Sequence, residues 1–138
     1  MLDYGHNLPG YEEVIRSCEG FGSARLIGVI GMPGDRKNQA VESVGRRCAQ
    51  SFQRLYIKED ADLRDRKKGE VAKLLFDAAV GGGCLPDRIS IAENELEGLK
   101  NALTDSEPGD LIVVFYEKLE PLHRYLTDLS ATKIQTLS

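Results

Sequence analysis

Four short apolar segments, separated from one another by stretches with helical periodicity, constrain the fold of this chain more than any other feature. The apolar segments cover residues 24–30, 55–57, 89–91 and 111–115. In the intervening stretches apolar residues recur at every third or fourth position, as on one face of an amphipathic helix. The connections are too long for hairpins, so the strands should run parallel, with helices on both faces of the sheet. The sequence therefore predicts the α/β class, as a three-layer, Rossmann-like domain with a mostly parallel sheet.

Some of the expected helices have clear signals at their ends. The apolar positions that define the helices are Tyr11, Val14, Ile15 and Cys18, then Val41, Val44, Cys48 and Phe52, then Val71, Leu74, Leu75 and Ala78, then Leu96, Leu99 and Leu103, and last Leu119, Leu122, Leu126 and Leu129. Asn7 is a candidate N-cap for the first helix, expected over about residues 10–19, and Asp35 for the second. The glycines at 81–83 predict the end of the third.

Length and composition restrict the class of protein further. The chain has 138 residues with 18 Lys+Arg and 22 Asp+Glu, a formal charge of -4, and is long enough for one domain, residues 1–138, with its own core. No apolar run reaches the ~20 residues that span a bilayer, and the N-terminus lacks the pattern of a signal peptide. We therefore expect a soluble, cytoplasmic protein with no membrane segment.

The three cysteines are odd in number and show no Cys-x-x-Cys spacing, which argues against a disulfide framework or a zinc site. Cys18 and Cys48 fall on apolar helical faces and are expected in the core. Cys84 follows the glycines in a connection that we expect to be flexible, and its thiol is predicted to be accessible to solvent without a role.

Ligands of such sheets bind beyond the carboxyl ends of the strands, so the segments that follow the strands are the candidate site. The first of these, Gly31 to Arg36, lies between a strand and a helix, where an anion is favoured. Neither it nor the rest of the chain has the Gly-Lys-Ser/Thr ending of a P-loop, which argues against an independent nucleoside triphosphatase. Two interpretations remain open: a tight turn with Asp35 as the helix cap, or a site where Arg36 meets a carboxylate or phosphate.

The second segment, Lys58 to Lys68, has nine charged residues among its eleven. It is either a solvated loop or a mixed-charge site for a zwitterion, with carboxylates facing an ammonium or guanidinium and arginine facing a carboxylate. Residues 36–73 hold 11 basic and 6 acidic residues, although the whole chain is acidic, and such a basic side draws in anionic ligands. Aromatic residues are not interleaved with the basic ones, so nucleic acid is not an expected partner.

At the N-terminus, Asp3-Tyr4-Gly5-His6-Asn7 gathers a carboxylate, an imidazole and an amide just before the first helix. From the residues alone it is either a helix-entry loop capped by Asn7 or a binding site. The only other histidine, His123, is expected on the surface of the closing helix.

Three of these motifs together resemble one family. Asp3 to Asn7 resembles the Asp-Tyr-Ala/Gly-His-Asn-Pro motif that opens the C-terminal domain of Mur ligases and folylpolyglutamate synthetases. Pro33-Gly34-Asp35-Arg36 resembles their Gly-Gly-Asp-Arg turn after the first parallel strand. The run from Lys58 to Arg66, followed by Gly69-Glu70, is similar to that of cyanophycin synthetases in particular. The resemblance extends from Asp3 to about Leu129.

The resemblance implies a role as the C-terminal lid of an ATP-dependent ligase that joins a carboxylate to an amine. ATP and Mg²⁺ would be bound mainly by an upstream Mur central domain, and an ATP-grasp domain would be a further partner. The lid would close over the ATP site and help to position the incoming amino acid, arginine or aspartate. Alone, the chain is not expected to turn over. The competing interpretation is a stand-alone ligand-binding or interaction module with the same fold and no reaction.

The resemblance also implies roles for individual residues. Asp3, His6 and Asn7 would lie at the hinge and contact the nucleotide. Arg36 and Arg64 would face the incoming amino acid, and Asp60 and Asp62 would suit the guanidinium of arginine. Beyond the last strand, Glu117 or Glu120 would join the substrate-binding residues. The resemblance assigns no catalytic residue and no metal ligand to this chain.

Overall fold

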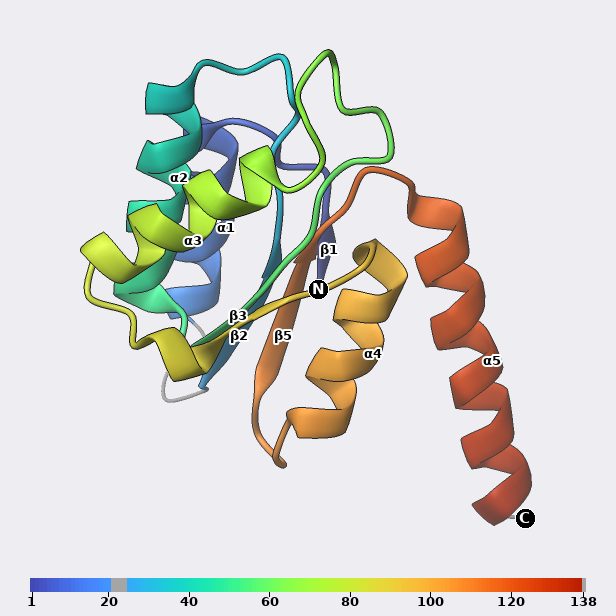
Figure 1. Cartoon of the computed structure of the whole chain (residues 1–138). Helices are drawn as coiled ribbons and strands as arrows, with labels where there is room; N and C mark the ends of the chain where they lie inside the picture. The colour runs from blue at the N-terminus through green and yellow to red at the C-terminus, as the bar shows by residue number, and fades with distance from the viewer. Residues whose placement is uncertain (21–24, 138) are drawn as a thin grey trace.

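The computed structural model of the chain describes the backbone of residues 1–20 and 25–137 and the side chains as far as residue 130 (Figure 1). Strands and helices alternate throughout this part of the chain. In order they are β1 Leu2–Asp3, α1 Leu8–Glu19, β2 Leu26–Ile30, α2 Asn38–Ser51, β3 Arg54–Ile57, α3 Glu70–Gly81, a 3₁₀ turn Pro86–Arg88, β4 Ile89–Ile91, α4 Glu95–Asp105, β5 Leu111–Phe115 and α5 Leu119–Leu137. The expected alternation is confirmed, and Ala24, at the predicted start of a strand, lies outside the described residues.

The five strands form one parallel sheet in the order β1-β5-β2-β3-β4. From β2 the chain proceeds to β3 and β4 on one side, and β5 then returns to the other side of β2. The strand order therefore reverses between β2 and β5, which is the switch point where such sheets bind ligands. Strand β1, which the apolar pattern did not predict, has only two residues and pairs with Val114 and Phe115 of β5.

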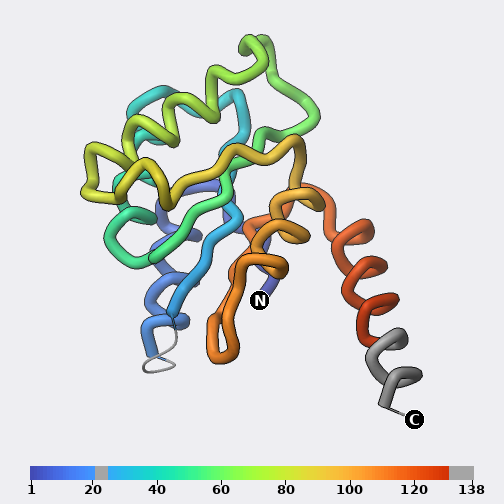
Figure 2. The backbone as a smooth tube through the Cα atoms, turned by 60° about the horizontal axis from the view of Figure 1, so that its bottom comes forward, coloured from blue at the N-terminus to red at the C-terminus, as the bar shows by residue number. Residues whose placement is uncertain are grey.

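Helices cover both faces of the sheet, as predicted. Helices α1, α2 and α3 lie on one face, and α4 lies on the other with α5 beside it; α5 extends past the body of the domain (Figures 1 and 2). Strand β2 is buried throughout, with Leu26 and Ile30 in the core under α1 to α3 and Ile27 and Val29 in the core under α4. A strand buried on both faces must be apolar at every position, which is the pattern that marked it in the sequence.

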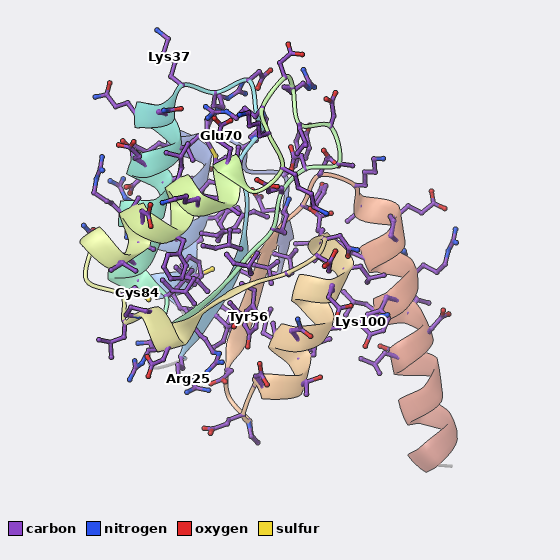
Figure 3. All side chains as sticks on the ribbon, viewed as in Figure 1. Arg25, Lys37, Tyr56, Glu70, Cys84 and Lys100 are labelled. Carbon is purple, nitrogen blue, oxygen red and sulfur yellow. The ribbon has the colours of Figure 1, made fainter. Side chains whose placement is uncertain are left out.

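The ends of the helices test the predicted caps. The Asn7 side chain accepts a hydrogen bond of 2.9 Å from the amide of Gly10, so the N-cap of α1 is confirmed, although α1 begins earlier than its apolar spacing indicated. Helix α3 ends at Gly81 with Gly82 as its C-cap, also as predicted. The prediction for Asp35 is wrong: α2 begins at Asn38 and its N-cap, Lys37, makes no side-chain cap and points into solvent (Figure 3).

The cysteines lie in or beside the core. Cys18 and Cys48 are 1% and 0% exposed, as expected. The prediction of an accessible thiol at Cys84 is wrong, since this residue is 7% exposed and burial raises the pKa of its thiol. Its amide bonds the carbonyl of Ala79, so the glycines fold the chain back over the end of α3 (Figure 3). Among the described residues, no helix is both long and apolar enough to cross a bilayer.

Candidate functional site

A pocket of about 490 Å³ opens at the carboxyl ends of β3, β4 and β5, at the upper edge of the sheet in Figure 1. One part of its lining is apolar and consists of Ala61, Leu63, Leu96, Pro121 and Leu122. The other part is charged and includes Lys58, Asp60, Glu95 and Glu117, which come from the connections after three different strands. The pocket can therefore contact both the aliphatic stem and the charged end of a ligand.

Lys58 is the buried cation of this pocket, with 2% of its surface exposed. Its Nζ lies 2.7 Å from Glu95 Oε1 and 3.3 Å from Asp60 Oδ1. An ammonium is tolerated at such depth only when it is paired, and here two carboxylates pair it. The sequence motifs include Lys58 but gave it no role of its own, because it begins a charged run that could equally be a solvated loop.

Glu95, the first residue of α4, is the second group to which the sequence motifs gave no role. Its carboxylate accepts the amides of Glu117 at 2.5 Å and Lys118 at 3.2 Å, in addition to the Lys58 ammonium. Asn94 caps α4 through the amide of Glu97, which fixes the start of the helix at the pocket. The only signal in the sequence was position, since residues 93–97 follow a predicted strand.

Glu117 lies in the connection between β5 and α5, and β2 separates β5 from β3, the strand that Lys58 follows. Burial raises the pKa of its carboxyl, and the negative charge of Asp60 raises it further. Its Oε1 accepts the amide of Ala61 at 3.4 Å. Asp60, Glu95 and Glu117 carry three negative charges against the one positive charge of Lys58, so this cluster favours a cationic ligand group.

Arg36, Asp62 and Arg64 do not join this pocket. With Asp35 they form an exposed cluster of four charges, in which Arg64 bridges Asp35 at 3.3 Å and Asp62 at 3.0 Å while Arg36 meets Asp35 at 3.2 Å. Arg64 itself is in the left-handed region at φ 49°. Of the predicted substrate-binding residues, only Asp60 and Glu117 line the pocket together; Glu120 lines another pocket, at the start of α5.

The predicted nucleotide residues, Asp3, His6 and Asn7, line a separate pocket of about 440 Å³ beside β1 and α1. His6 Nδ1 lies 3.0 Å from the Tyr4 carbonyl, so Nδ1 carries the proton and Nε2 stays free to accept in the neutral ring. The Asn7 oxygen is occupied by the cap, which leaves its amide group as a donor. The rings of Tyr4 and Tyr116 lie 5.6 Å apart next to His6.

A small pocket of about 30 Å³ at the switch point between β2 and β5 shares lining residues with both the N-terminal pocket and the charged pocket. Its lining includes His6 from the N-terminal pocket, Lys58, Asp60 and Glu117 from the charged pocket, and Gly31 from the end of β2. Within the described part of the chain, no group of three or more His, Cys, Asp or Glu is arranged to hold a metal ion. The residues present therefore offer polar contacts to a ligand but no metal cage.

Comparison with known proteins identifies the family. Residues 1–115 match the profile of the Mur ligase, glutamate ligase domain. The chain belongs to this family. The match includes every residue that the motifs had singled out except Glu117 and Glu120, which lie beyond it.

The Mur ligase domain described here is similar to several curated proteins. It is 35% identical over 119 residues to cyanophycin synthetase of Crocosphaera subtropica, a match that covers 86% of this chain and 13% of that protein. Cyanophycin synthetase of Synechocystis sp. is also 35% identical, over 123 residues with the same coverage. The UDP-N-acetylmuramoyl-L-alanyl-D-glutamate--L-lysine ligase of Staphylococcus aureus is 24% identical over 88% of the chain and 23% of that ligase. The chain thus spans 13% of the length of the cyanophycin synthetases that it matches.

Solved structures share the fold of this Mur ligase domain. The UDP-N-acetylmuramoyl-L-alanyl-D-glutamate--2,6-diaminopimelate ligase matches with a TM-score of 0.62 and 18% identity, over 82% of this chain and 22% of that one. Folylpolyglutamate synthase of Mycobacterium tuberculosis, complexed with ADP, matches with a TM-score of 0.61 and 20% identity, over 81% and 25%. At these identities the likeness supports the fold alone. The resemblance drawn from the motifs is confirmed, and the roles of individual residues stay predictions.

Proposed function

We propose that this chain is the C-terminal lid domain of an ATP-dependent ligase of the cyanophycin synthetase type, which joins a carboxylate to an amine. The small pocket at the switch point carries the proposal, because groups from the N-terminal pocket and from the charged pocket line it together. A ligase must bring an activated carboxylate and an amine to one point. Two ligand pockets that meet at the carboxyl edge of the sheet supply that arrangement.

The N-terminal pocket is the proposed nucleotide side. Asp3 offers a carboxylate, His6 a ring nitrogen and Asn7 an amide donor, which suit the hydroxyls and phosphates of a nucleotide. ATP supplies the activation of the carboxylate. We propose that an upstream Mur central domain binds most of it together with Mg²⁺, with an ATP-grasp domain as a further partner, since this chain has no P-loop and the described residues form no metal cage.

The charged pocket is the proposed amine side, and its charge favours arginine over aspartate. The apolar lining would pack against the methylene groups of arginine, and Asp60 and Glu117 would face its guanidinium. Arg36 and Arg64, which pair with Asp35 in the exposed cluster, would meet the carboxylate of the amino acid or of the second substrate. Closure of the lid would bring both sets of groups onto the substrates.

The direct test of the amine side is a titration of the labelled chain with L-arginine and with citrulline, followed by amide chemical shifts. Citrulline has a side chain of the same length but without charge, so we expect it to bind about tenfold more weakly or worse. Shifts should concentrate at residues 60–63 and 117–118. Glu117→Gln should remove the preference for arginine, whereas Glu120→Gln, on the exposed start of α5, should keep it. Equal binding of the two ligands by the unchanged chain would contradict the proposal.

The nucleotide side is tested separately by titration with ADP. Shifts are expected at residues 3–7 and not at the charged pocket. The chain by itself should neither hydrolyse ATP nor form an amide, because its sequence has no P-loop to bind the phosphates of ATP. Turnover that scales with the concentration of the pure chain would show that the lid assignment is incomplete.

A further inference from the structure

We infer that Glu95 is a positioning residue of the charged pocket: held by the buried Lys58, it fixes the backbone of Glu117 and Lys118 and thereby aims the Glu117 side chain into the pocket. The inference deepens the proposed function, on which it rests for the ligand that Glu117 meets. The placement of Glu117 by Glu95 is a property of this chain and can be measured without any ligand.

The contacts of Glu95 show that it works through other groups. Oε1 accepts the Lys58 ammonium at 2.7 Å and the amide of Glu117 at 2.5 Å, and Oε2 accepts the amide of Lys118 at 3.2 Å. Its side chain is only 13% exposed. Because both oxygens are engaged by groups of the chain, Glu95 has little capacity left for a ligand, although it lines the pocket.

Lys58 reaches Glu95 along a path that Gly31 leaves open. A Cβ at Gly31 would lie 2.8 Å from Lys58 Cε and 2.9 Å from Lys58 Cδ, so a side chain there would displace the lysine. The side chain of Lys58 is only 3% exposed, so its ammonium requires carboxylates around it. Residues that follow four strands therefore meet at this pair: Gly31 after β2 packs on Lys58 after β3, and Glu95 after β4 bonds both Lys58 and the amide of Glu117 after β5.

Glu117 needs this support because its backbone belongs to neither a helix nor a strand. Residues 116–118 connect β5 to α5, and the amide of Tyr116 is held by the Asp3 carbonyl at 2.9 Å. The next two amides are held by Glu95 alone. The carboxyl of Glu117 itself has two contacts, the amide of Ala61 at 3.4 Å and the carboxyl of Asp60, and neither holds its backbone. Without Glu95, the connection would lose the bonds that set the direction of Glu117.

The test compares Glu95→Asp and Glu95→Gln with Glu97→Gln in the 138-residue chain. Glu97 is exposed in the same first turn of α4, so its substitution is a matched control for charge near the helix start. Glu95→Asp keeps the charge but is one methylene shorter and cannot reach Lys58 and both amides. We expect the amides of Glu117 and Lys118 to exchange with deuterium about tenfold faster or more in both Glu95 variants. In Glu97→Gln their exchange should stay as in the unchanged chain.

The second readout is the titration of the Glu117 carboxyl, followed by NMR. The charges that act on this carboxyl are those of Asp60 and Lys58, and Glu95 lies nearby at the Glu117 amide. In Glu95→Asp all of these charges remain, so a fall in the pKa of Glu117 toward its ordinary value reports that its carboxyl has moved into solvent. A merely structural role for Glu95 would lower the thermal midpoint and leave this titration unchanged. If Glu95→Gln fails to fold, Glu95→Asp carries both measurements.

Unchanged exchange at residues 117–118 together with an unchanged Glu117 titration in Glu95→Asp would overturn the inference. If both change as expected, L-arginine should bind Glu95→Asp about tenfold more weakly than Glu97→Gln. If the unchanged chain does not bind L-arginine at all, the amine side of the proposed function fails, while the exchange and titration still decide whether Glu95 positions Glu117.

Discussion

Replacing Gly34 should destabilise the protein more than replacing any other glycine near the site. Two of the connections that form the site are in contact at Gly34. A Cβ at Gly34 would lie 2.1 Å from the carbonyl oxygen of Leu63 and 2.8 Å from its carbonyl carbon. Gly34 belongs to the connection after β2 and Leu63 to the charged loop after β3. Gly34→Ala must therefore push the two backbones apart, since neither of these atoms is the end of a flexible side chain.

The cost follows from what holds the two connections together. Arg66, whose side chain is 13% exposed, donates from Nε to the Gly34 carbonyl at 2.8 Å and from Nη2 to the Arg36 carbonyl at 2.6 Å. Overpacking costs about 1–3 kcal/mol, and a lost hydrogen bond to a charged group about 1.5–3 kcal/mol. We expect Gly34→Ala to lower the free energy of unfolding by about 3 kcal/mol or more, and the thermal midpoint by about 10 °C.

Gly81→Ala is the matched control for this experiment. A Cβ at Gly81, the last residue of α3, would meet no atom within 4 Å. Alanine restricts the unfolded chain and favours the helix, so this variant should gain about 0.5–1 kcal/mol. Urea unfolding at constant m-value measures both changes. A Gly34→Ala protein within about 0.5 kcal/mol of the unchanged chain would refute the argument from the Gly34–Leu63 contact.

Two further predictions concern groups at the switch point. Tyr11→Phe should lower the free energy of unfolding by about 2–3 kcal/mol, because the buried hydroxyl donates to the Gly31 carbonyl at 2.6 Å and accepts its amide at 3.2 Å; a loss below about 0.5 kcal/mol in urea unfolding would contradict this. For Glu117, a raised pKa means that the folded state binds the proton more tightly than the unfolded state, so its contribution to stability is present at low pH and is lost as the pH rises through the folded pKa. Compared with Glu117→Gln, the unchanged chain should therefore lose stability as the pH rises from the ordinary carboxyl pKa through the raised pKa of the folded state. Thermal midpoints with the same pH slope in both proteins would refute the shift.

The sequence predicted the fold because the strands in the middle of the sheet are largely buried on both faces. Strands β2 and β5 lie in the middle of the sheet and are apolar or glycine at every position, so no alternation pattern was needed to find them. Strand β1 has two residues and exists only through pairing with β5, more than 100 residues away along the chain. A strand that short has no pattern of its own. Cys84 was misjudged for the same reason, since its burial depends on how the glycines fold back onto α3 and not on its neighbours in sequence.

The site was predictable as a set of segments but not as a set of contacts. Asp60 and Asp62 are two residues apart in one charged loop, yet Asp60 pairs with Lys58 in the pocket while Asp62 pairs with Arg64 in the exposed cluster. Shortly after Asp62 the backbone turns, and Arg64 and Asp65 both adopt positive φ values, of 49° and 69°. Neither residue type marks such a turn in the way that glycine does, so the sequence offered no signal for it.

Lys58 was not predicted as a residue of the site, although one sequence signal for it did exist. Its amide continues the sheet by bonding the Ile30 carbonyl at 2.9 Å, so Lys58 is the last residue held by the ladder of β3 and not the first residue of a free loop. A lysine directly after the apolar end of a strand in a parallel sheet should therefore be expected at the carboxyl edge, where ligands bind. Which carboxylate would neutralise it was out of reach of the sequence, since Glu95 lies 37 residues further on, behind a helix and another strand. Lys58 can be buried only because Gly31 has no side chain in its path, and these two residues become neighbours only when β2 and β3 pair in the sheet.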